Sequence, residues 1–415
     1  MSRVVMTGMP AAGHVNPSLP LVRELVRQKI EVTYYSTEQF RDAVERTGAE
    51  FRPYPAETIS ADDIADATRA GSPVRVVHRV LTATERLLPF LLTEMCTEPP
   101  DAVAFDSNAI WGRMAAASLR LPMISLMTTI LLGADAFRSQ TPRELFQFVR
   151  AIVPDLPGTI AARQRVVRRF GKQIFPPSPA LPMRGDVTIF PIPRWLQPAD
   201  PRIDEHCHFI GATIDPDTRS RDLDPELAAH LDGAEPLVLV SLGTLHAGSD
   251  AFFRTCFQVL ADLPARVLLA VGSHTDPALL GPPPANTLVR ASVPQLEVLR
   301  RTTVFVTHGG MNSVLEGLAN GVPLVVIPQQ FEQLVIGQAV ADQGAAGVLR
   351  HNLSNRPVPP AELRAAVEQA LTLPSRPAAA KALADTVGEG GGAPAGVGAI
   401  KDLLAGNGLR ERAAG

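Results

Sequence analysis

Short apolar runs alternate with longer segments of helical periodicity along most of the chain. In the segment Ser18–Gln28, which follows Pro17, apolar residues recur at spacings of three and four and share one face, which predicts a helix. The short apolar runs of the first half predict strands at Arg3–Gly8, Glu31–Ser36, Asp101–Asp106 and Pro122–Leu126. Strands that alternate with helices in this way are typical of parallel βαβ units.

The second half repeats this rhythm. Its apolar runs predict strands at Leu237–Thr244, Arg266–Gly272, Asn286–Arg290, Thr303–Thr307 and Pro323–Pro328. We therefore predict an α/β protein with two doubly wound parallel-sheet domains. The expected divisions are an N-terminal domain over 1–214, a polar linker over 215–235, a C-terminal domain over 236–390, and a last helix over 391–415 that returns to the N-terminal domain. The glycine-rich stretch Gly388–Gly398 should interrupt the helical C-terminus.

Composition narrows the class of protein. The chain has 415 residues, 46% of them hydrophobic, and a net charge of -3, which suits a globular protein with two cores and no nucleic-acid partner. The three cysteines are widely spaced, which predicts single buried thiols and neither a disulfide framework nor a metal site. The N-terminus lacks the apolar core of a signal peptide, and no apolar run is long enough to cross a membrane. We therefore expect a cytoplasmic protein without a membrane partner.

The richest group of polar residues follows the strand Thr303–Thr307, where the chain continues HGGMNSVLEG. Ligands of open α/β sheets bind beyond the carboxyl ends of strands, and the next helix offers free N–H groups and the positive end of its dipole. His308, Asn312 and Ser313 could donate hydrogen bonds to a phosphate there. Glu316, one turn later, could accept from two ribose hydroxyls. This pattern predicts a nucleotide site, with Gly310 allowing the backbone close to the anion.

Two simpler interpretations apply to single parts of this pattern. A glycine-rich connector with a helix cap at Asn312 explains the pair of glycines alone, but not the whole set with Glu316. The turn SLGT at the end of the strand Leu237–Thr244 is a weak signal by itself. Beside the first site, the backbone at Gly243 and the hydroxyl of Thr244 could hold the other side of a diphosphate.

The loop GMPAAGHVNP joins the first strand to the first helix and is not a dinucleotide-binding fingerprint. It should place His14 just before the helix and Asn16 near its N-cap, where the helix dipole favours a neutral ring that can act as a base. Asp106 ends another strand of the same domain and could orient that ring and stabilise its charged form. A role of Asp106 as the cap of the helix Asn108–Ser118 explains its position equally well.

The long motif VTHGGMNSVLEGLANGVPLVVIPQQFEQ, preceded by VPQLEVL, resembles the nucleotide-sugar signature of the UDP-glycosyltransferase superfamily, glycosyltransferase family 1. The stretch GHVNPSLPLVRELV is similar to the bacterial macrolide glycosyltransferase branch. The resemblance implies a GT-B fold, with two Rossmann-like domains facing across a cleft. The C-terminal domain would bind the nucleotide sugar, and the N-terminal domain would bind the acceptor.

The resemblance also implies roles for single residues. It assigns His14 as general base with Asp106 as its partner. The remaining assignments concern the sugar nucleotide: the base is contacted by Gln295 and the Val293 backbone, the diphosphate by His308, Asn312, Ser313 and Thr244, the ribose by Glu316, and the transferred sugar by Glu332 and Gln333. No Asp-x-Asp metal motif occurs in the expected place, so the resemblance implies that no metal is required. Ser292 stands where the family has an aromatic residue that stacks on the base, and Glu332 where aspartate is common.

The first hypothesis is an inverting glycosyltransferase that moves a sugar from a nucleotide donor to a hydroxyl of a small lipophilic natural product, such as a macrolide, another polyketide or a phenol. UDP-glucose is favoured as the donor because the Glu332–Gln333 pair can bind several hydroxyls. A dTDP-deoxysugar transferase, a nucleotide-sugar epimerase and a nucleotide-sugar-binding helper of a partner transferase are the alternatives. The sequence leaves a monomer and a homodimer equally open.

Overall fold

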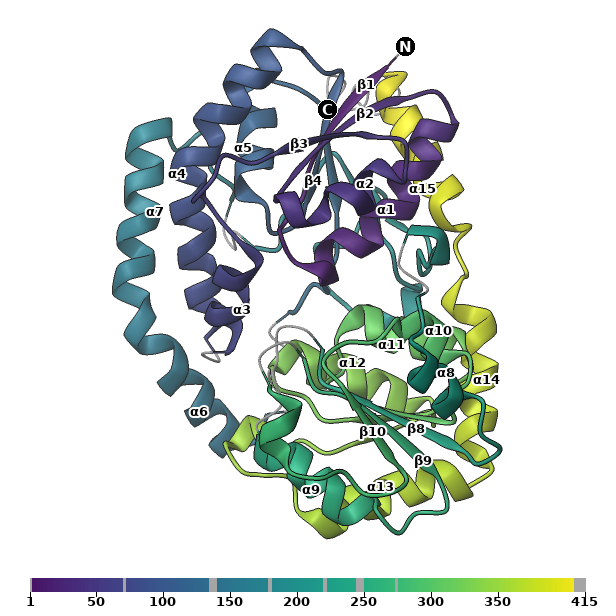
Figure 1. Cartoon of the computed structure of the whole chain (residues 1–415). Coiled ribbons are helices and arrows are strands. Elements are labelled where there is room, and N and C mark those ends of the chain that lie inside the picture. The colour runs from purple at the N-terminus through teal and green to yellow at the C-terminus, as the bar shows by residue number, and fades with distance from the viewer. Residues whose placement is uncertain are drawn as a thin grey trace. The chain divides into compact units, whose positions relative to one another are not determined.

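The computed structural model describes residues 2–69, 72–133, 140–177, 181–218, 222–243, 250–272 and 275–406. The chain forms two compact units (Figure 1). Unit 1 contains Met1–Phe137, Val149–Thr218 and Gly388–Gly415, and unit 2 contains Arg138–Phe148 and Arg219–Val387. The division therefore falls inside helix α6 (Pro142–Ile152) and again just after helix α14 (Ser375–Val387).

Unit 1 is built on a parallel sheet of seven strands in the order β3-β2-β1-β4-β5-β6-β7. The strands are β1 (Arg3–Thr7), β2 (Glu31–Ser36), β3 (Glu50–Pro53), β4 (Ala102–Asp106), β5 (Met123–Leu126), β6 (Val187–Phe190) and β7 (Cys207–Phe209). The helices that belong wholly to this unit are α1 (Ala12–Arg27), α2 (Arg41–Glu45), α3 (Ala61–Arg69), α4 (Pro73–Thr97), α5 (Ile110–Leu119), α7 (Leu156–Phe170) and α15 (Gly392–Leu404). The predicted strands of the first half are confirmed, whereas the short strands β3, β6 and β7 were missed.

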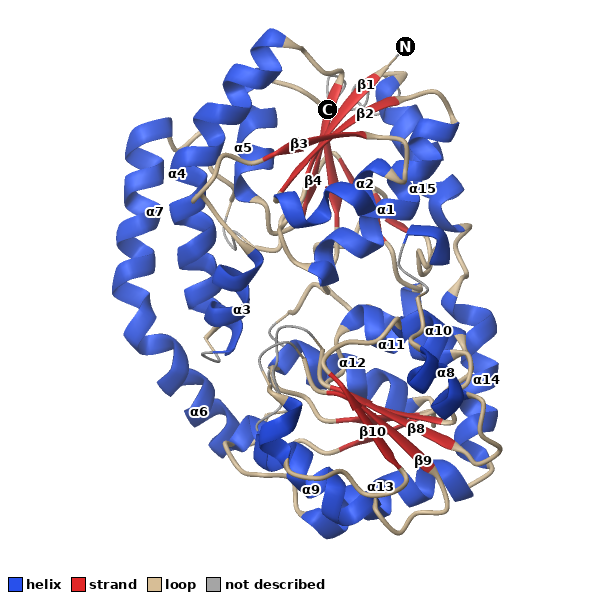
Figure 2. Cartoon of the chain, viewed as in Figure 1, coloured by secondary structure: helices blue, strands red, loops and turns tan. Residues whose placement is uncertain are grey.

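Helices cover both faces of this sheet (Figure 2), and alternate residues of each strand point to opposite cores. Val5 of β1 packs in a cluster with side chains of α3, α4, α5 and α7. Its neighbours Val4 and Met6 pack in a second cluster with side chains of α1 and α15. Burial on both faces explains why the strands of a parallel sheet are almost continuously apolar.

Unit 2 has a parallel sheet of six strands in the order β10-β9-β8-β11-β12-β13. The strands are β8 (Leu237–Ser241), β9 (Arg266–Ala270), β10 (Thr287–Arg290), β11 (Val304–Thr307), β12 (Leu324–Val326) and β13 (Ala346–Val348). The helices are α8 (Pro225–Leu231), α9 (Asp250–Leu260), α10 (Gln295–Leu299), α11 (Met311–Ala319), α12 (Phe331–Asp342), α13 (Pro360–Thr372) and α14. Two parallel-sheet α/β units confirm the predicted fold class.

The glycine-rich stretch near the C-terminus is shorter as an interruption than predicted. The helical structure is interrupted only between Val387 and Gly392, because α15 continues through Gly396 and Gly398. A β-carbon on Gly396 would lie 2.8 Å from a methyl carbon of Leu21, so this glycine allows α15 to approach α1 closely. The segment that looked like a loop signal is therefore a packing surface of unit 1.

One smaller expectation, on the cysteines, needs correction. Cys256 is buried and Cys207 is partly buried, but Cys96 is exposed, so the prediction of three buried thiols was wrong for Cys96; all three cysteines are free. No helix in the described ranges combines the length and the apolar character that crossing a membrane requires.

Candidate functional site

Each sheet changes its winding direction at one point, and there the loops after two neighbouring strands diverge. In unit 1 this point lies between β1 and β4, and in unit 2 it lies between β8 and β11. Ligands of doubly wound sheets bind at such switch points, beyond the carboxyl ends of the strands. The predicted residues follow these strands, with His14 after β1, Asp106 at the end of β4, Gly243 after β8 and His308 after β11.

The switch point of unit 1 brings His14 and Asp106 together. The Nδ1 atom of His14 lies 2.9 Å from Oδ2 of Asp106, although 92 residues separate them in sequence. Asp106 is almost fully buried, with 1% of its side chain exposed, whereas 20% of the His14 side chain remains exposed. One ring nitrogen is therefore held against a buried carboxylate while the ring still reaches the surface of the unit.

The local structure around His14 differs from the prediction. Helix α1 begins at Ala12, with Ala11 as N-cap, so His14 lies in the first turn and Asn16 lies well inside the helix. Pro17 and Pro20 stand within α1, although proline normally ends or begins a helix. The burial of the α1 face in the apolar core that also holds β1 outweighs the hydrogen bonds that the prolines remove.

The N-cap of α5 is Ala109, and no described side chain caps this helix, so the prediction of Asp106 as helix cap is wrong and Asp106 instead faces His14. Its Oδ1 accepts a hydrogen bond of 2.8 Å from the backbone N–H of Asn108, in the turn that leads into α5. Its Oδ2 faces His14 and accepts a second hydrogen bond of 2.8 Å from the hydroxyl of Thr128, which follows β5. The two oxygens therefore divide the roles, because one fixes the turn and the other faces the imidazole.

Buried tyrosines hold the loop between β1 and α1. The Tyr54 hydroxyl donates to the Gly8 carbonyl at 3.0 Å and accepts from the Trp111 indole at 2.9 Å. The Tyr34 hydroxyl lies 2.9 Å from that of Ser18, in α1. Burial raises the pKa of both Tyr34 and Tyr54 well above the ordinary value of the phenol, so both stay neutral. These neutral hydrogen bonds fix the backbone that carries His14.

The switch point of unit 2 carries His308 between two glycines. A β-carbon on Gly310 would lie 2.4 Å from Nε2 of His308, and one on Gly243 would lie 2.6 Å from its Cε1. Any larger residue at either position would displace the imidazole. Gly309, which follows His308 in the sequence, has a φ of +85°, a value that favours glycine. The glycines that the sequence presented as phosphate contacts thus also make room for the histidine ring.

Helix α11 starts directly after these glycines and presents its first turn to the same place. Gly310 is the N-cap, and no described side chain caps this helix end, which is the positive end of the helix dipole. Asn312 and Ser313 lie in the first turn and are both partly exposed. The carboxamide nitrogen of Gln295, at the start of α10, donates to Glu316 at 2.7 Å and to Ser313 at 3.3 Å. Glu316 itself is 1% exposed.

The other predicted residues of unit 2 occupy neighbouring loops. Val293 lies in the partly buried segment before α10, and Glu332 is a partly exposed residue in the first turn of α12. Gln333 is 7% exposed, and its side-chain oxygen accepts from the backbone N–H groups of Gln329 at 2.8 Å and Gln330 at 3.1 Å. Thr244 lies outside the described residues.

Two features of these sites escaped the sequence reasoning. Gln330 and Gln333 form a capping box at the start of α12, so Gln333 has a structural role besides the sugar contact that the resemblance implies. The spacing of the two residues, three apart before an apolar run, was the available signal. Thr128 follows an apolar strand in the run MTTI and carries no motif of its own, so only the tertiary structure brings it to Asp106.

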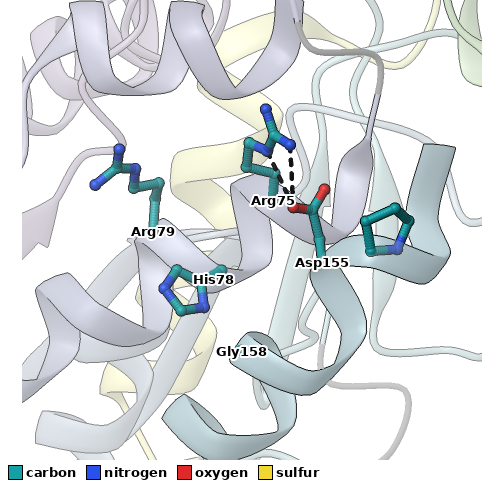
Figure 3. Close-up of a pocket in the computed structure, with 6 residues that line it drawn as sticks. Arg75, His78, Arg79, Asp155 and Gly158 are labelled. Carbon is teal, nitrogen blue, oxygen red and sulfur yellow. Dashed lines mark hydrogen bonds and ion pairs between the residues drawn. The ribbon is translucent and has the colours of Figure 1, made fainter.

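The structure also contains a surface cavity of about 460 Å³ on unit 1 (Figure 3). Its lining comes from α4, from the short 3-10 turn Val153–Asp155 and from the start of α7, and it includes the ion pair between Arg75 and Asp155, at 3.1 Å. None of the predicted site residues lines this cavity. The predicted site residues therefore belong to the switch points and not to this cavity.

The chain is similar in sequence and in structure to several known proteins. Residues 203–375 match the family described as UDP-glucoronosyl and UDP-glucosyl transferase. The oleandomycin glycosyltransferase of Streptomyces antibioticus is 32% identical over 84% of this chain and 79% of its own length. The demethyllactenocin mycarosyltransferase of Streptomyces fradiae is 30% identical over 82% of this chain and 74% of its own. The crystal structure of the kitacinnamycin glycosyltransferase superposes with a TM-score of 0.79 and 29% identity over 97% of this chain and 99% of that one. This likeness confirms the GT-B fold.

Proposed function

Because the chain belongs to the UDP-glycosyltransferase family and is a glycosyltransferase, we propose that it transfers a sugar, with inversion at the anomeric carbon, to a hydroxyl of a lipophilic natural product. The observation that carries this proposal is the contact of 2.9 Å between the partly exposed His14 and the buried Asp106. A histidine held in this way is suited to take a proton from an acceptor hydroxyl.

The proposed reaction begins at His14. The Nδ1–H group donates to Asp106, which leaves Nε2 as the nitrogen that accepts the proton of the acceptor hydroxyl. The hydroxyl oxygen attacks the anomeric carbon, and the nucleoside diphosphate leaves from the opposite face, so that an α-linked sugar becomes a β-glycoside. Asp106 stabilises the imidazolium that forms. A base placed in this way contributes about 10²–10⁴-fold to the rate.

The unit 2 residues are assigned to the nucleotide sugar. His308, the side chains of Asn312 and Ser313, and the N-terminus of α11 would bind the diphosphate and stabilise the charge of the leaving group. Because these groups are donors or positive dipole ends, the proposal requires no metal ion. Gln295 and the Val293 backbone would contact the base, and Thr244 would contribute to the diphosphate.

The Gln295–Glu316 hydrogen bond refines the proposed ribose site. Its length of 2.7 Å places the residue assigned to the base directly beside the residue assigned to the ribose. A buried carboxylate that already accepts one hydrogen bond is oriented for a second acceptor role toward a sugar hydroxyl. We therefore assign these two residues to one nucleoside-binding pair.

UDP-glucose is the favoured donor. Glu332 and the carboxamide of Gln333 lie at the start of α12, where they would meet several hydroxyls of a hexose. A dTDP-deoxysugar offers fewer hydroxyls and is the second candidate, which the name of the mycarosyltransferase relative favours. The acceptor class, a macrolide, another polyketide or a phenol, follows the names of the relatives, which include an oleandomycin glycosyltransferase.

The experiment that tests this proposal measures nucleotide release from UDP-glucose with and without a panel of macrolide and phenolic acceptors, followed by the mass of the products. A product heavier by one hexose that forms only with acceptor supports it. Turnover of the sugar nucleotide without acceptor would indicate an epimerase, and activity only with a co-purified protein would indicate a helper. The variant H14A should lose transfer while its affinity for UDP stays within about twofold, and undiminished turnover in H14A would remove the histidine from the mechanism.

A further inference from the structure

Thr128 completes a triangle of polar atoms with the two residues of the unit 1 site. Its Oγ1 lies 2.8 Å from Nδ1 of His14 and 2.8 Å from Oδ2 of Asp106, which themselves are 2.9 Å apart. Thr128 is 7% exposed, so water competes little for its hydroxyl. The hydroxyl has one hydrogen and faces two acceptor atoms, and the atom that receives this hydrogen decides the protonation of the imidazole.

Two hydrogen-bond arrangements fit these three atoms. In the first, Thr128 and the Nδ1–H of His14 both donate to Asp106, which leaves Nε2 without a proton and able to act as a base. In the second, Thr128 donates to Nδ1, the ring carries its proton on Nε2, and the lone pair of Nδ1 faces a carboxylate oxygen. The second arrangement places two acceptors 2.9 Å apart with no hydrogen between them. An ionised carboxylate is the stronger acceptor, so the first arrangement prevails.

The carboxylate oxygen that Thr128 contacts is the one that faces His14. The other oxygen is taken by the Asn108 backbone N–H at 2.8 Å, so the carboxylate cannot rotate without losing that hydrogen bond. Thr128 is held at the end of β5, where its N–H donates to the Leu126 carbonyl at 3.1 Å. With its hydrogen toward Asp106, the hydroxyl turns its lone pairs toward the Nδ1–H group, which stabilises that proton.

We propose that Thr128 is a positioning residue: its hydroxyl donates to Asp106 and accepts from the Nδ1–H group, and so fixes the His14 ring in the orientation in which Nε2 accepts the acceptor proton. The consequence for the rate rests on the proposed function, whereas the consequence for the Nδ1–H group is a property of the free protein. Thr128 acts through His14 and Asp106 and needs no contact with the substrates.

The test compares T128V, which keeps the shape but removes the hydroxyl, with T128S, which keeps the hydroxyl. The matched control is T7V, because Thr7 is a buried threonine at the end of β1, the strand that pairs with β4, and its hydroxyl has no hydrogen-bond partner in the described structure. The NMR signal of the His14 Nδ1–H proton, assigned from its absence in the H14Q variant, reports through its exchange rate with water how firmly this proton is held in the free protein. We expect slow exchange in the wild type, T128S and T7V, and about tenfold faster exchange in T128V, because one of the two oxygens that face this proton is lost.

The kinetic test uses the same variants. Since a hydrogen bond to a charged group is lost, T128V should reduce kcat roughly tenfold to a hundredfold, while the KM for the nucleotide sugar stays unchanged. T128S should restore most of the rate. In the D106A background, T128V should have less than about a third of its effect on log kcat, because the carboxylate through which it acts is absent.

The outcomes separate the two proposals. An unchanged exchange rate of the His14 Nδ1–H proton in T128V, or an equal loss of rate with and without Asp106, would overturn the role of Thr128. Faster exchange in T128V but not in T128S or T7V supports it even if the wild type fails to transfer a sugar. Such a failure of transfer would count against the proposed function alone.

Discussion

The ion pair between Glu144 and Arg350 should stabilise unit 2 in a way that depends on which partner is removed. Arg350 donates to the two carboxylate oxygens of Glu144 at 2.7 and 2.6 Å. Glu144 also accepts the Thr141 backbone N–H at 2.7 Å at the start of α6. The carboxylate is buried, with 3% of the Glu144 side chain exposed, whereas 35% of the Arg350 side chain is exposed. The pair attaches the first half of α6 to unit 2.

The expected loss of stability differs for the two partners because Glu144 is buried and Arg350 is partly exposed. Breaking a fully buried pair costs about 3–5 kcal/mol, and breaking an exposed pair costs about 0–1 kcal/mol. R350M leaves a buried carboxylate whose remaining hydrogen-bond partner among the described residues is Thr141, so we expect a loss of about 2 kcal/mol. E144Q keeps the contact to Thr141 and leaves an arginine whose side chain can reorient into water, so we expect a loss of about 1 kcal/mol. The double variant should lose less than the sum of the two.

Hydrogen–deuterium exchange of the α6 amides measures the effect, because the chain has two units and global unfolding need not be two-state. A loss of about 2 kcal/mol corresponds to roughly thirtyfold faster opening. The matched control is R364M, since Arg364 is 32% exposed but its partner Glu368, at 2.7 Å, is 44% exposed. Equal effects of R350M on α6 and of R364M on α13 would refute the reasoning from carboxylate burial.

The same pair predicts a pH dependence. Burial opposes the charged form of Glu144, but the hydrogen bonds from Arg350 and Thr141 outweigh it and hold the pKa of Glu144 below its usual value of 4.5. A lowered pKa in the folded state means that the stabilisation is present above the usual value and is lost as the pH falls through the lowered one. The difference between the wild type and R350M should therefore shrink below about pH 4.

Two further predictions concern the nucleotide site. G310A should weaken UDP binding at least tenfold in calorimetry, because its β-carbon would lie 2.4 Å from Nε2 of His308. The control G347A, whose β-carbon would meet nothing within 4 Å, should bind like the wild type. Tight binding by G310A would contradict the proposed role of His308. S292W should tighten UDP binding about threefold to tenfold, because Ser292 is exposed in the loop before α10 and an aromatic ring there would stack on the base. The control A291W should leave the affinity for UDP unchanged. Equal affinities of S292W and the wild type would place the base elsewhere.

The local structure around the site shows how far sequence patterns reach. The strand β11 and the start of α11 follow from an apolar run, two glycines and a helical period, so His308, Asn312 and Ser313 could be placed at a strand end in advance. The start of α1 could not be predicted from the sequence, because burial of the α1 face overrides the rule that proline begins a helix. The missed strands β6 and β7 are short, with four and three residues, and carry little periodicity.

The sequence by itself determined the fold class, the strand-tip positions of the polar residues, and the family through its long motif. Those features depend on residue type and spacing along a short stretch of chain. Only the tertiary structure decided which residues meet across long separations. It brought His14 and Thr128, 114 residues apart, to the same carboxylate, and it assigned Glu144 to unit 2 through a partner 206 residues away. Strand order and the burial of both sheet faces create these contacts, and no short sequence pattern specifies either of them.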